Sequence, residues 1–349
     1  MRILVTGHNG YIGCVLVPHL LSLGHDVHGF DTNYYSASVF SGELPEVPSV
    51  TKDIRNAELS DVQGFDAVIH LAALSNDPLG DYQPELTHQI NTLATLRLAK
   101  LAKAAGVHRF LFASSCSNYG RAGDDFVCED SQAAPTTPYA RSKVTVEAEL
   151  AHLANEDFVP VFLRASTAYG SSPMLRFDLV INNLTAWAFT TGRIYLKSTG
   201  EAWRPVVHVA DIARAYSAVL DAPTRDVSCR AFNIGATSEN YRIIDLAKLI
   251  AEVVPNSEVQ FAPGAEADAR SYRVNCDRIL SELEGFHPTW TAQQGIEQLH
   301  QLYRGVGLQL KEFEGERFSR IAHIKMLQSQ GRLCDSLHWQ IPCEDRYCT

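Results

Sequence analysis

Short apolar runs alternate with helical patterns over the first two thirds of the chain, and this alternation restricts the possible folds more than any other feature. The helical patterns are clearest at residues 92–106 and 142–155, where leucine and alanine recur at helical spacing. Strands that alternate with helices form a parallel sheet with right-handed crossovers. We therefore predict an α/β protein built on a doubly wound parallel sheet. Its predicted strands are residues 2–7, 26–31, 66–73, 109–115, 159–166 and 230–235.

The alternation is interrupted in the C-terminal half of the chain. It becomes irregular after residue 170, returns within 204–235 and is then lost again. We expect residues 1–170 and 204–235 to form the sheet domain. Residues 171–203 and 236–349 are expected to form a smaller, discontinuous substrate lobe with a C-terminal tail, since 349 residues suffice for one large core and a minor lobe. We interpret the tail from residue 317 as a packing element or a partner contact.

Charge and cysteine usage exclude several kinds of partner. With 40 acidic and 30 basic residues and a net charge of −10, the chain lacks the broad positive charge that binds nucleic acid or anionic membranes. Glycines interrupt the apolar N-terminal run after a few residues, so neither a signal peptide nor a membrane span fits, and we expect a cytoplasmic protein. No CxxC pair or metal-ligand histidine spacing occurs, so no metal is predicted.

The segment VTGHNGYIG places three glycines between the first strand and the first helix. Gly7 permits a sharp turn, Gly10 lets the backbone approach phosphates, and Gly13 lets the helix pack close to the strand. A dinucleotide pyrophosphate there meets free N–H groups and the helix dipole. Three glycines also serve ordinary turns, so the spacing alone does not decide. The cofactor residues predicted in this segment are Gly7, Gly10, Tyr11, Ile12 and Gly13.

Asp31 favours the cofactor interpretation of this turn. It ends the second strand, 21 residues after Gly10, where a carboxylate accepts hydrogen bonds from the adenosine ribose hydroxyls. A carboxylate there repels a 2′-phosphate, and no arginine or lysine lies beside it in GFDTNYYSAS. The sequence therefore predicts a Rossmann-type site that binds NAD rather than NADP.

Seven ordered motifs resemble the extended short-chain dehydrogenase/reductase family, specifically its NAD-dependent nucleotide-sugar epimerase/dehydratase branch. The resemblance covers about residues 1–300 and rests on TGHNGYIG, the aspartate of GFD, KDIRN, HLAA, SSCSNYG, YARSK and RPVVHVADIA. It implies catalysis by Ser115, Tyr139 and Lys143. It implies further cofactor contacts from Asp53, Ile54, Leu71, Ala72, Ala73, Asn91, Tyr139 and Lys143. The resemblance also implies a homodimer, built on a four-helix contact from residues 92–106 and 142–155 of each subunit.

The implied catalytic set suits the oxidation of a sugar alcohol. Hydride leaves for the nicotinamide only if the hydroxyl proton leaves too, and a tyrosinate is the implied base. An isolated tyrosine has a pKa of about 10, so Lys143 and the positive nicotinamide ring must favour the phenolate of Tyr139. Ser115 then hydrogen-bonds the reacting oxygen. The alternative is that Ser115 is only a hydroxyl at the end of a strand and Tyr139 only an aromatic residue at the start of a helix. The ordered motifs favour a catalytic role over this alternative.

The substrate implied by the resemblance is a nucleotide-diphosphate sugar. The resemblance implies that Arg204 and Asn183 bind its diphosphate, and Arg270 is a second candidate arginine. For each arginine the alternative is an ordinary surface salt bridge. The residues predicted to contact the substrate are Ser115, Cys116, Ser117, Thr167, Asn183, Arg204 and Arg270.

Cys116 and Ser117 separate the possible reactions. Sugar 4,6-dehydratases of the family have aspartate and glutamate at these two positions, so dehydration is disfavoured here. The preferred function is an NAD-dependent nucleotide-sugar epimerase that acts at C4 through a transient keto-sugar. The alternatives are a C4 dehydrogenase or ketoreductase on such a sugar, and an NAD-binding regulatory protein without turnover.

Overall fold

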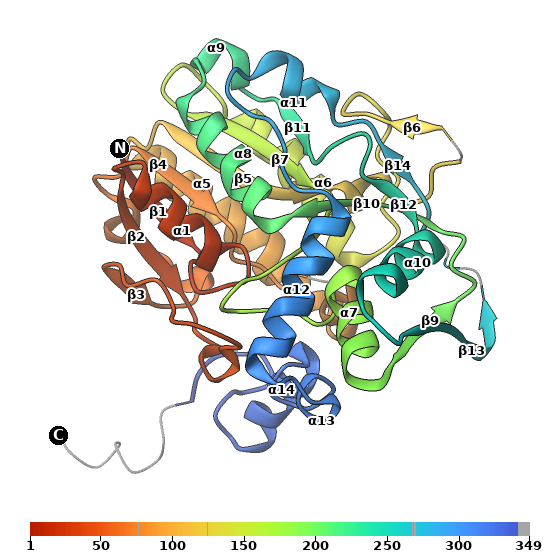
Figure 1. The fold of residues 1–349 in the computed structure, drawn as a ribbon. Helices are drawn as coiled ribbons and strands as arrows, with labels where there is room; N and C mark the ends of the chain where they lie inside the picture. Colours follow the sequence, from red (N-terminus) through yellow and green to blue (C-terminus); the bar gives the residue numbers. More distant parts are fainter. Residues whose placement is uncertain (76, 124, 267, 269, 341–349) are drawn as a thin grey trace.

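The computed structural model describes residues 1–75, 77–123, 125–266, 268 and 270–340. Within them the centre of the fold is a seven-stranded sheet in the order β11-β7-β5-β4-β1-β2-β3, and every neighbouring pair is parallel. Its strands are β1 (Arg2–Thr6), β2 (Asp26–Asp31), β3 (Ser49–Thr51), β4 (Ala67–His70), β5 (Arg109–Ser115), β7 (Val159–Ala165) and β11 (Ala231–Ile234). The predicted doubly wound α/β fold is confirmed (Figure 1).

Helices cover both faces of this sheet, which explains why its strands are continuous apolar runs. Side chains alternate along each strand, so Ile3 and Val5 pack with α1 and α8, whereas Leu4 packs with α5 and α6 on the opposite face. The covering helices are α1 (Gly13–Ser22), α5 (Thr95–Ala104), α6 (Pro138–Leu153) and α8 (Val209–Asp221).

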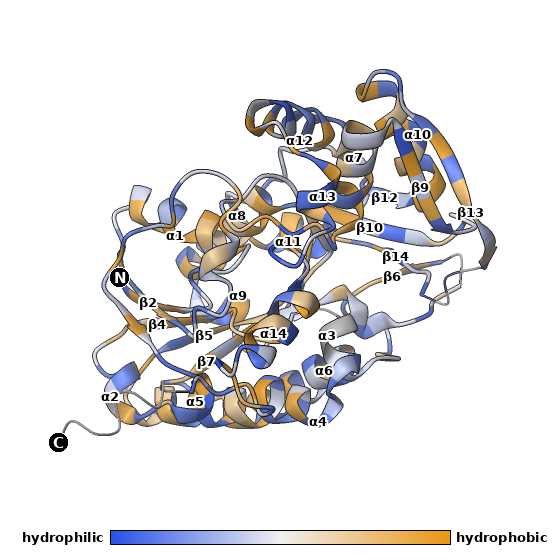
Figure 2. Cartoon of the chain, turned by 90° about the horizontal axis from the view of Figure 1, so that it is seen from below, coloured by the Kyte–Doolittle hydropathy of each residue, from blue (hydrophilic) through white to orange (hydrophobic). Residues whose placement is uncertain are grey.

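A second group of elements has its own apolar core and lies to one side of the sheet (Figure 2). Leu184, Ile194, Ile250 and Leu299 contribute to that core from four different elements. Its helices are α7 (Val180–Thr191), α10 (Ile243–Val253), α12 (Ala292–Val306) and α13 (Leu310–Phe313). Its strands are β8 (Thr167–Tyr169), β9 (Arg193–Ser198), β10 (Trp203–His208), β12 (Asn240–Arg242) and β13 (Glu258–Glu266). β10 pairs with β8 and β12, and β9 pairs with β13.

Two segments of the proposed substrate lobe pack with the sheet rather than with this second core. Ile279 and Phe286 join the core on the α1 face, and Ile324 and Leu327 join the core on the α5 face. The first pair lies on or near α11 (Asp277–Glu282), and the second lies on α14 (Arg320–Ser329). The C-terminal tail, up to residue 340, is therefore a packing element of this chain, while residues 341–349 lie outside the described part.

Short segments make up the remaining connections. They are α2 (Leu59–Val62), α3 (Asp77–Tyr82), α4 (Pro84–Thr87), α9 (Thr224–Val227), a π-helical segment (His88–Ala94), the paired strands β6 (Phe126–Val127) and β14 (Arg273–Val274), and 3₁₀ turns at Ser36–Ser38, Ile54–Asn56 and Cys116–Tyr119. Among the described helices, none combines the length and the apolar character that crossing a membrane requires.

Candidate active site

The turn between β1 and α1 has the geometry that a phosphate-binding turn needs. Gly7 has a φ of +73°, and a Cβ there would lie 2.8 Å from the backbone nitrogen of Ala72. A Cβ on Gly13 would lie 2.4 Å from the carbonyl oxygens of Gly7 and His8. Neither position accepts a side chain without backbone movement. The N-terminus of α1 can therefore lie close to β1 and to the chain that follows β4.

A groove of about 150 Å³ begins at this turn. Its walls come from the carboxyl ends of β1, β2 and β4 and from the chain after β3, the edge of a parallel sheet where nucleotides bind. The predicted cofactor residues that line it are Gly7, Gly10, Tyr11, Ile12, Gly13, Asp31, Asp53, Ile54, Leu71, Ala72 and Ala73. The structure thus brings most of the predicted cofactor residues together.

Asn91 is the exception, because it lines neither this groove nor the neighbouring cavity. It is buried in the π-helical segment, where its Oδ1 accepts a 2.8 Å hydrogen bond from Leu74 N and its Nδ2 donates a 3.0 Å bond to Leu74 O. Both backbone groups of Leu74 are thereby satisfied by one side chain. Asn91 therefore holds the wall of the groove in place rather than forming its surface.

The two acidic residues of the groove are held by different partners. Asp31 accepts hydrogen bonds from the backbone nitrogens of Asn9 at 3.1 Å and Asn33 at 2.9 Å, which leaves further lone pairs of its carboxylate for a ribose. Asp53 accepts from Arg55 Nη2 at 2.6 Å and Nε at 3.0 Å. Burial alone would raise the pKa of Asp53, but the hydrogen bonds from Arg55 outweigh it and keep that pKa below its usual value.

A second cavity, of about 830 Å³, continues the groove toward the smaller lobe. The two share Ile12, Leu71, Ala73, Ser75 and Arg176 as lining residues, so they form one continuous site. The predicted catalytic and substrate residues on the wall of the second cavity are Ser115, Ser117, Tyr139, Lys143, Thr167, Asn183, Arg204 and Arg270. We call this second space the reaction cavity.

Cys116, predicted beside the substrate, does not line the reaction cavity. Its side chain is buried, and its Sγ donates to the carbonyl oxygen of Arg164 at 3.1 Å. Ser115 and Ser117, on either side of it, line the cavity, so the chain turns the thiol toward β7. Burial raises the pKa of the Cys116 thiol to about 12, which leaves it protonated near neutral pH.

Local capping places Tyr139 and Lys143 on the cavity wall. Thr137 caps α6 by accepting a 3.2 Å hydrogen bond from Ala140 N, so Tyr139 lies in the first helical turn and Lys143 one turn later. Lys143 Nζ lies 5.5 Å from the centroid of the Tyr139 ring and donates to Ala113 O at 2.6 Å. Burial lowers the pKa of Lys143 to about 7. This lysine is therefore a desolvated amine beside the tyrosine, at the end of β5 where Ser115 lies, and a phenolate on Tyr139 would favour its charged form.

Glu147 helps to hold α6, and with it Tyr139 and Lys143, against the sheet. The sequence alone did not indicate this role. One turn after Lys143 on α6, it accepts hydrogen bonds from Ser114 Oγ, from Asn118 Nδ2 at 3.0 Å and from Arg164 Nη2 at 2.6 Å. These bonds join α6 to β5 and β7. The signal in the sequence is the four-residue spacing from Tyr139 through Lys143 to Glu147, which puts all three on one face of the helix.

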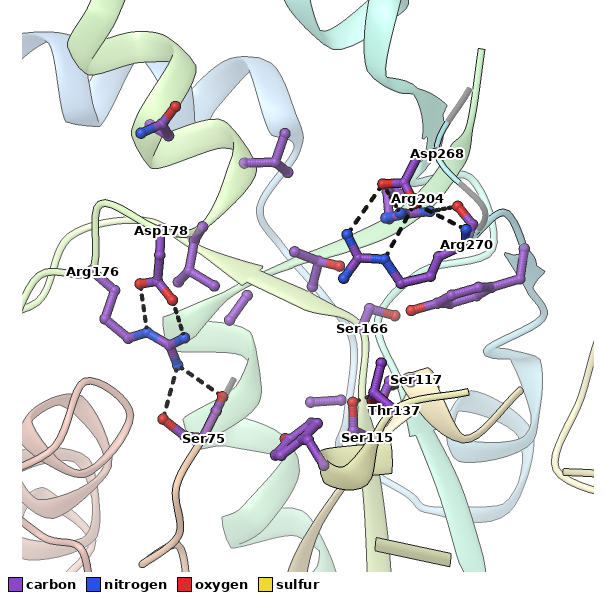
Figure 3. A pocket seen from close by; sticks show the side chains of 18 of the residues that line it. Ser75, Ser115, Ser117, Thr137, Ser166, Arg176, Asp178, Arg204, Asp268 and Arg270 are labelled. Carbon is purple, nitrogen blue, oxygen red and sulfur yellow. Dashed lines mark hydrogen bonds and ion pairs between the residues drawn. The ribbon is translucent and has the colours of Figure 1, made fainter. Parts of the chain in front are cut away.

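Charged pairs lie on two sides of the reaction cavity (Figure 3). On one side Arg204 Nη2 lies 2.7 Å and Arg270 Nη2 lies 3.2 Å from Asp268 Oδ2. On the other side Arg176 forms a two-pronged pair with Asp178, at 3.0 and 2.6 Å. The sequence suggested the arginines at 204 and 270 but not Asp268, which shares its charge with both. Asn183 Nδ2 donates to Phe177 O at 2.8 Å.

Comparison with known proteins decides the family. Residues 3–235 match the model of the NAD dependent epimerase/dehydratase family, which is about two thirds of the chain. The chain belongs to this family. Its similar relatives include the UDP-glucose 4-epimerase of Bacillus subtilis (strain 168), at 25% identity over 86% of this chain and 94% of the relative. The UDP-glucose 4-epimerase of Erwinia amylovora is 27% identical over 86% of this chain and 95% of its own.

Solved structures of the family are similar over nearly their whole length. MoeE5 in complex with UDP-glucuronic acid and NAD has a TM-score of 0.76 and 27% identity, and covers 87% of this chain and 99% of its own. The UDP-glucose 4-epimerase of Thermus thermophilus, in complex with NAD, has a TM-score of 0.72 and 26% identity, with 87% and 99% covered. The predicted family and its NAD dependence are confirmed.

The residues of the groove fit NAD. The close approach at Gly7 and Gly13 leaves the N-terminus of α1 open to a pyrophosphate, and Asp31 is held at the end of β2 with lone pairs to spare. These residues would hold the ADP half of the cofactor. Tyr139 and Lys143, in the reaction cavity, would hold the nicotinamide riboside.

Proposed function

We propose that this chain is an NAD-dependent epimerase that inverts C4 of a nucleotide-diphosphate sugar through a transient keto-sugar. The observation that carries the proposal is the convergence of Ser115, Tyr139 and Lys143 on a cavity that continues the NAD groove. Two comparisons support it, since curated relatives are UDP-glucose 4-epimerases and a similar structure holds a UDP-sugar beside NAD.

In the proposed mechanism the protein moves one proton at the sugar hydroxyl. Bound NAD supplies the acceptor and donor of hydride. Tyr139, as phenolate, removes the hydroxyl proton when the alcohol is oxidised and returns it when the ketone is reduced. Lys143 stabilises that phenolate by its charge, because it is desolvated and lies over the same ring. Ser115 Oγ donates a hydrogen bond to the reacting oxygen and keeps it in line.

Dehydration would require a further acid and base, and the neighbouring residues supply neither. The thiol of Cys116 is buried against β7 with a raised pKa. Ser117 lines the cavity, and its buried Oγ has no hydrogen-bond partner among the described residues. A buried hydroxyl in that position is a poor acid for expelling water.

A C4 dehydrogenase or ketoreductase is the second candidate function. It would use the same three catalytic residues and differ only in whether the keto-sugar leaves before it is reduced. An NAD-binding regulator without turnover is the third, and the intact Ser115, Tyr139 and Lys143 argue against it. Turnover of external NAD separates the first two, because an epimerase returns its hydride to the substrate.

We expect purified protein to convert a nucleotide-diphosphate hexose into its C4 epimer without change of mass. A panel of nucleotide sugars is incubated with the enzyme, and products are followed by mass spectrometry, by proton NMR coupling constants and by absorbance of NADH. A product lighter by about 18 mass units, one water, would contradict the assignment of Cys116 and Ser117. A keto-sugar formed with stoichiometric NADH would instead support the dehydrogenase.

We further propose that Arg204, Arg270 and Asn183 bind the substrate diphosphate. Guanidinium groups bind phosphate oxygens in pairs, and both arginines reach the cavity wall on the same side. Asp268 bridges them in the structure. A diphosphate would take over hydrogen bonds that this carboxylate now accepts, and Thr167 on the adjoining wall would face the sugar.

The homodimer implied by the family resemblance also remains a proposal. Leu98 on α5 and Leu150 on α6 are fully buried in the subunit's own core, so a dimer must use the outer face of these helices. Leu93, just before α5, is 51% exposed there. We expect light scattering to give a dimer at micromolar concentration and Leu93→Lys to give a monomer, while Leu59→Lys, at an exposed leucine on α2, leaves the mass unchanged. A stable wild-type monomer would contradict the proposal.

A further inference from the structure

The C-terminal segment 317–340 lies against the chain that follows β2 (Figure 1), and its residue Arg320 lines the NAD groove. At its start, Arg317 donates to Ala37 O at 3.0 Å and to Val39 O at 2.6 Å, and Ser38 Oγ donates to Arg317 O at 2.7 Å. These three bonds fix the entry to α14 on the loop after β2.

The end of the segment is anchored beside Asp53. Leu333 and Trp339 pair as an isolated antiparallel bridge, and Trp339 Nε1 donates to Thr32 O at 2.7 Å. Arg55 Nη1, whose other nitrogens bind Asp53, donates to Ser336 O at 2.7 Å. The segment is therefore held at both ends by polar contacts to residues that surround the groove.

Apolar packing makes the segment a fixed part of the fold. Ile324, Leu327, Leu333 and Leu337 are nearly fully buried in the core on the α5 face of the sheet. Burial of four such side chains is worth about 1.5–3 kcal/mol each, which is ample to hold a helix of ten residues in place. The side chains of α14 that face the groove are thus positioned as firmly as those of the sheet domain.

Arg320, the first residue of α14, is the cation that this segment presents to the groove. Its guanidinium carbon lies 3.8 Å from the centroid of the Tyr35 ring. Among the described residues, no carboxylate lies within 4 Å of its nitrogens. Burial lowers the pKa of Arg320, and the charges of Asp178 and Asp31 partly oppose this shift. An arginine that lines the same groove as Gly7 and Gly10, with no ion pair to a carboxylate among the described residues, is suited to bind an anion there.

We propose that Arg320 binds the pyrophosphate of NAD, so that the C-terminal segment completes the cofactor site. Gly10 and the N-terminus of α1, where a pyrophosphate is expected, line the same groove as Arg320. Arg320 shares this space with Asp31, at the adenosine end, and with Arg176, at the junction with the reaction cavity. Arg320 is close enough to both Asp31 and Arg176 for their charges to shift its pKa, so the middle of a dinucleotide bound along the groove can reach it.

The test compares nucleotides that differ only in their phosphates. Full-length protein freed of bound cofactor is titrated calorimetrically with adenosine, ADP, NAD and NADP. Arg320→Met is expected to weaken ADP and NAD about 10- to 100-fold, the range for a charge-assisted hydrogen bond, and to leave adenosine within about twofold. Lys325→Met removes one exposed cation from the same helix, over Tyr82, and is expected to change none of these affinities.

Three results would overturn the proposal. Unchanged ADP affinity in Arg320→Met would show that the arginine does not bind the pyrophosphate. An equal loss for adenosine and ADP would assign Arg320 to the packing of the segment alone, and a loss for NADP without one for ADP would assign it to a 2′-phosphate. Should Arg320→Met fail to fold, Arg320→Gln removes the charge and keeps a polar side chain, and an ADP affinity equal to wild type in that variant would contradict the proposal. All readouts are binding measurements, so they stand independently of whether the enzyme epimerises its substrate.

Discussion

Tyr139→Phe is expected to lower kcat by about 100-fold or more while leaving the affinity for NAD nearly unchanged. The substitution removes one oxygen atom and leaves the ring in the first turn of α6, where Thr137 still caps the helix. Without the phenolate, the sugar hydroxyl loses its proton only to water, and a positioned general base is worth about 10²–10⁴ in rate. Single-turnover formation of NADH with the natural substrate, beside titration with NAD, measures both quantities.

Tyr195→Phe is the matched control, because Tyr195 lines the same cavity from β9. It lies next to Trp187, with the ring centroids 6.0 Å apart. We expect this variant to keep kcat within a few-fold of wild type. Activity of Tyr139→Phe in that same range would show that another group removes the proton, and the proposed mechanism would fail with it.

The strands of the sheet were predictable because both of its faces are covered. The run 109–115 matches β5 residue for residue, and 26–31 matches β2, since a buried parallel strand needs apolar side chains on both faces. β3 (Ser49–Thr51) was missed. All three of its residues are exposed at the sheet edge, so no burial pattern marks it in the sequence.

The elements of the smaller lobe were less predictable because their partners are distant in the sequence. β9 pairs with β13, which lies about 65 residues later in the sequence. β10 pairs in parallel with β8, which precedes it, and antiparallel with β12, which follows it. The helical periodicity of the tail was visible, but a periodic pattern says only that one face is buried and not what covers it. That Ile324 packs in the sheet core, and that Arg320 consequently faces the groove, required the tertiary structure.

The predictability of the site residues also depended on whether local sequence or distant contacts determine their positions. Residues predicted at strand ends, such as Asp31 and Ser115, lie on the walls of the groove and the reaction cavity, because parallel strands end at a common edge. Cys116 was expected on the wall as well, but the chain enters a 3₁₀ turn there and directs its side chain inward. Glu147 and Asp268 escaped prediction because an ion pair depends on which segments meet, and local spacing does not carry that information.

Lys143→Met is expected to have two opposite effects, a large loss of activity and a gain in stability of the cofactor-free protein. The catalytic effect follows from the neighbouring phenol. An opposite charge within about 4–6 Å shifts a pKa by about 1–3 pH units, so its removal lowers the fraction of phenolate about 10- to 1000-fold. The methionine has similar length, so kcat measured over a range of pH should fall most near neutrality and recover partly in alkaline solution.

The effect on stability has the reverse sign because the lysine charge is buried. The pKa of Lys143 falls from 10.5 to about 7 on folding, so between these values the unfolded chain holds a proton that the folded protein has released. The cost of burying the charge is therefore fully present below about pH 7 and disappears as the pH rises toward 10.5. Methionine removes this cost, and it also removes the hydrogen bond to Ala113 O, worth about 1 kcal/mol.

We therefore expect Lys143→Met to unfold in urea with a free energy higher than wild type by on the order of 1–3 kcal/mol at pH 7, and with no advantage at pH 10. Lys103→Met is the control, because Lys103 Nζ also donates to a backbone carbonyl, that of Leu153, but lies near the protein surface. Its stability relative to wild type should not vary between the two pH values. A Lys143→Met protein that is less stable than wild type at pH 7, or whose advantage grows with pH, would mean that the cation is stabilised in the folded state.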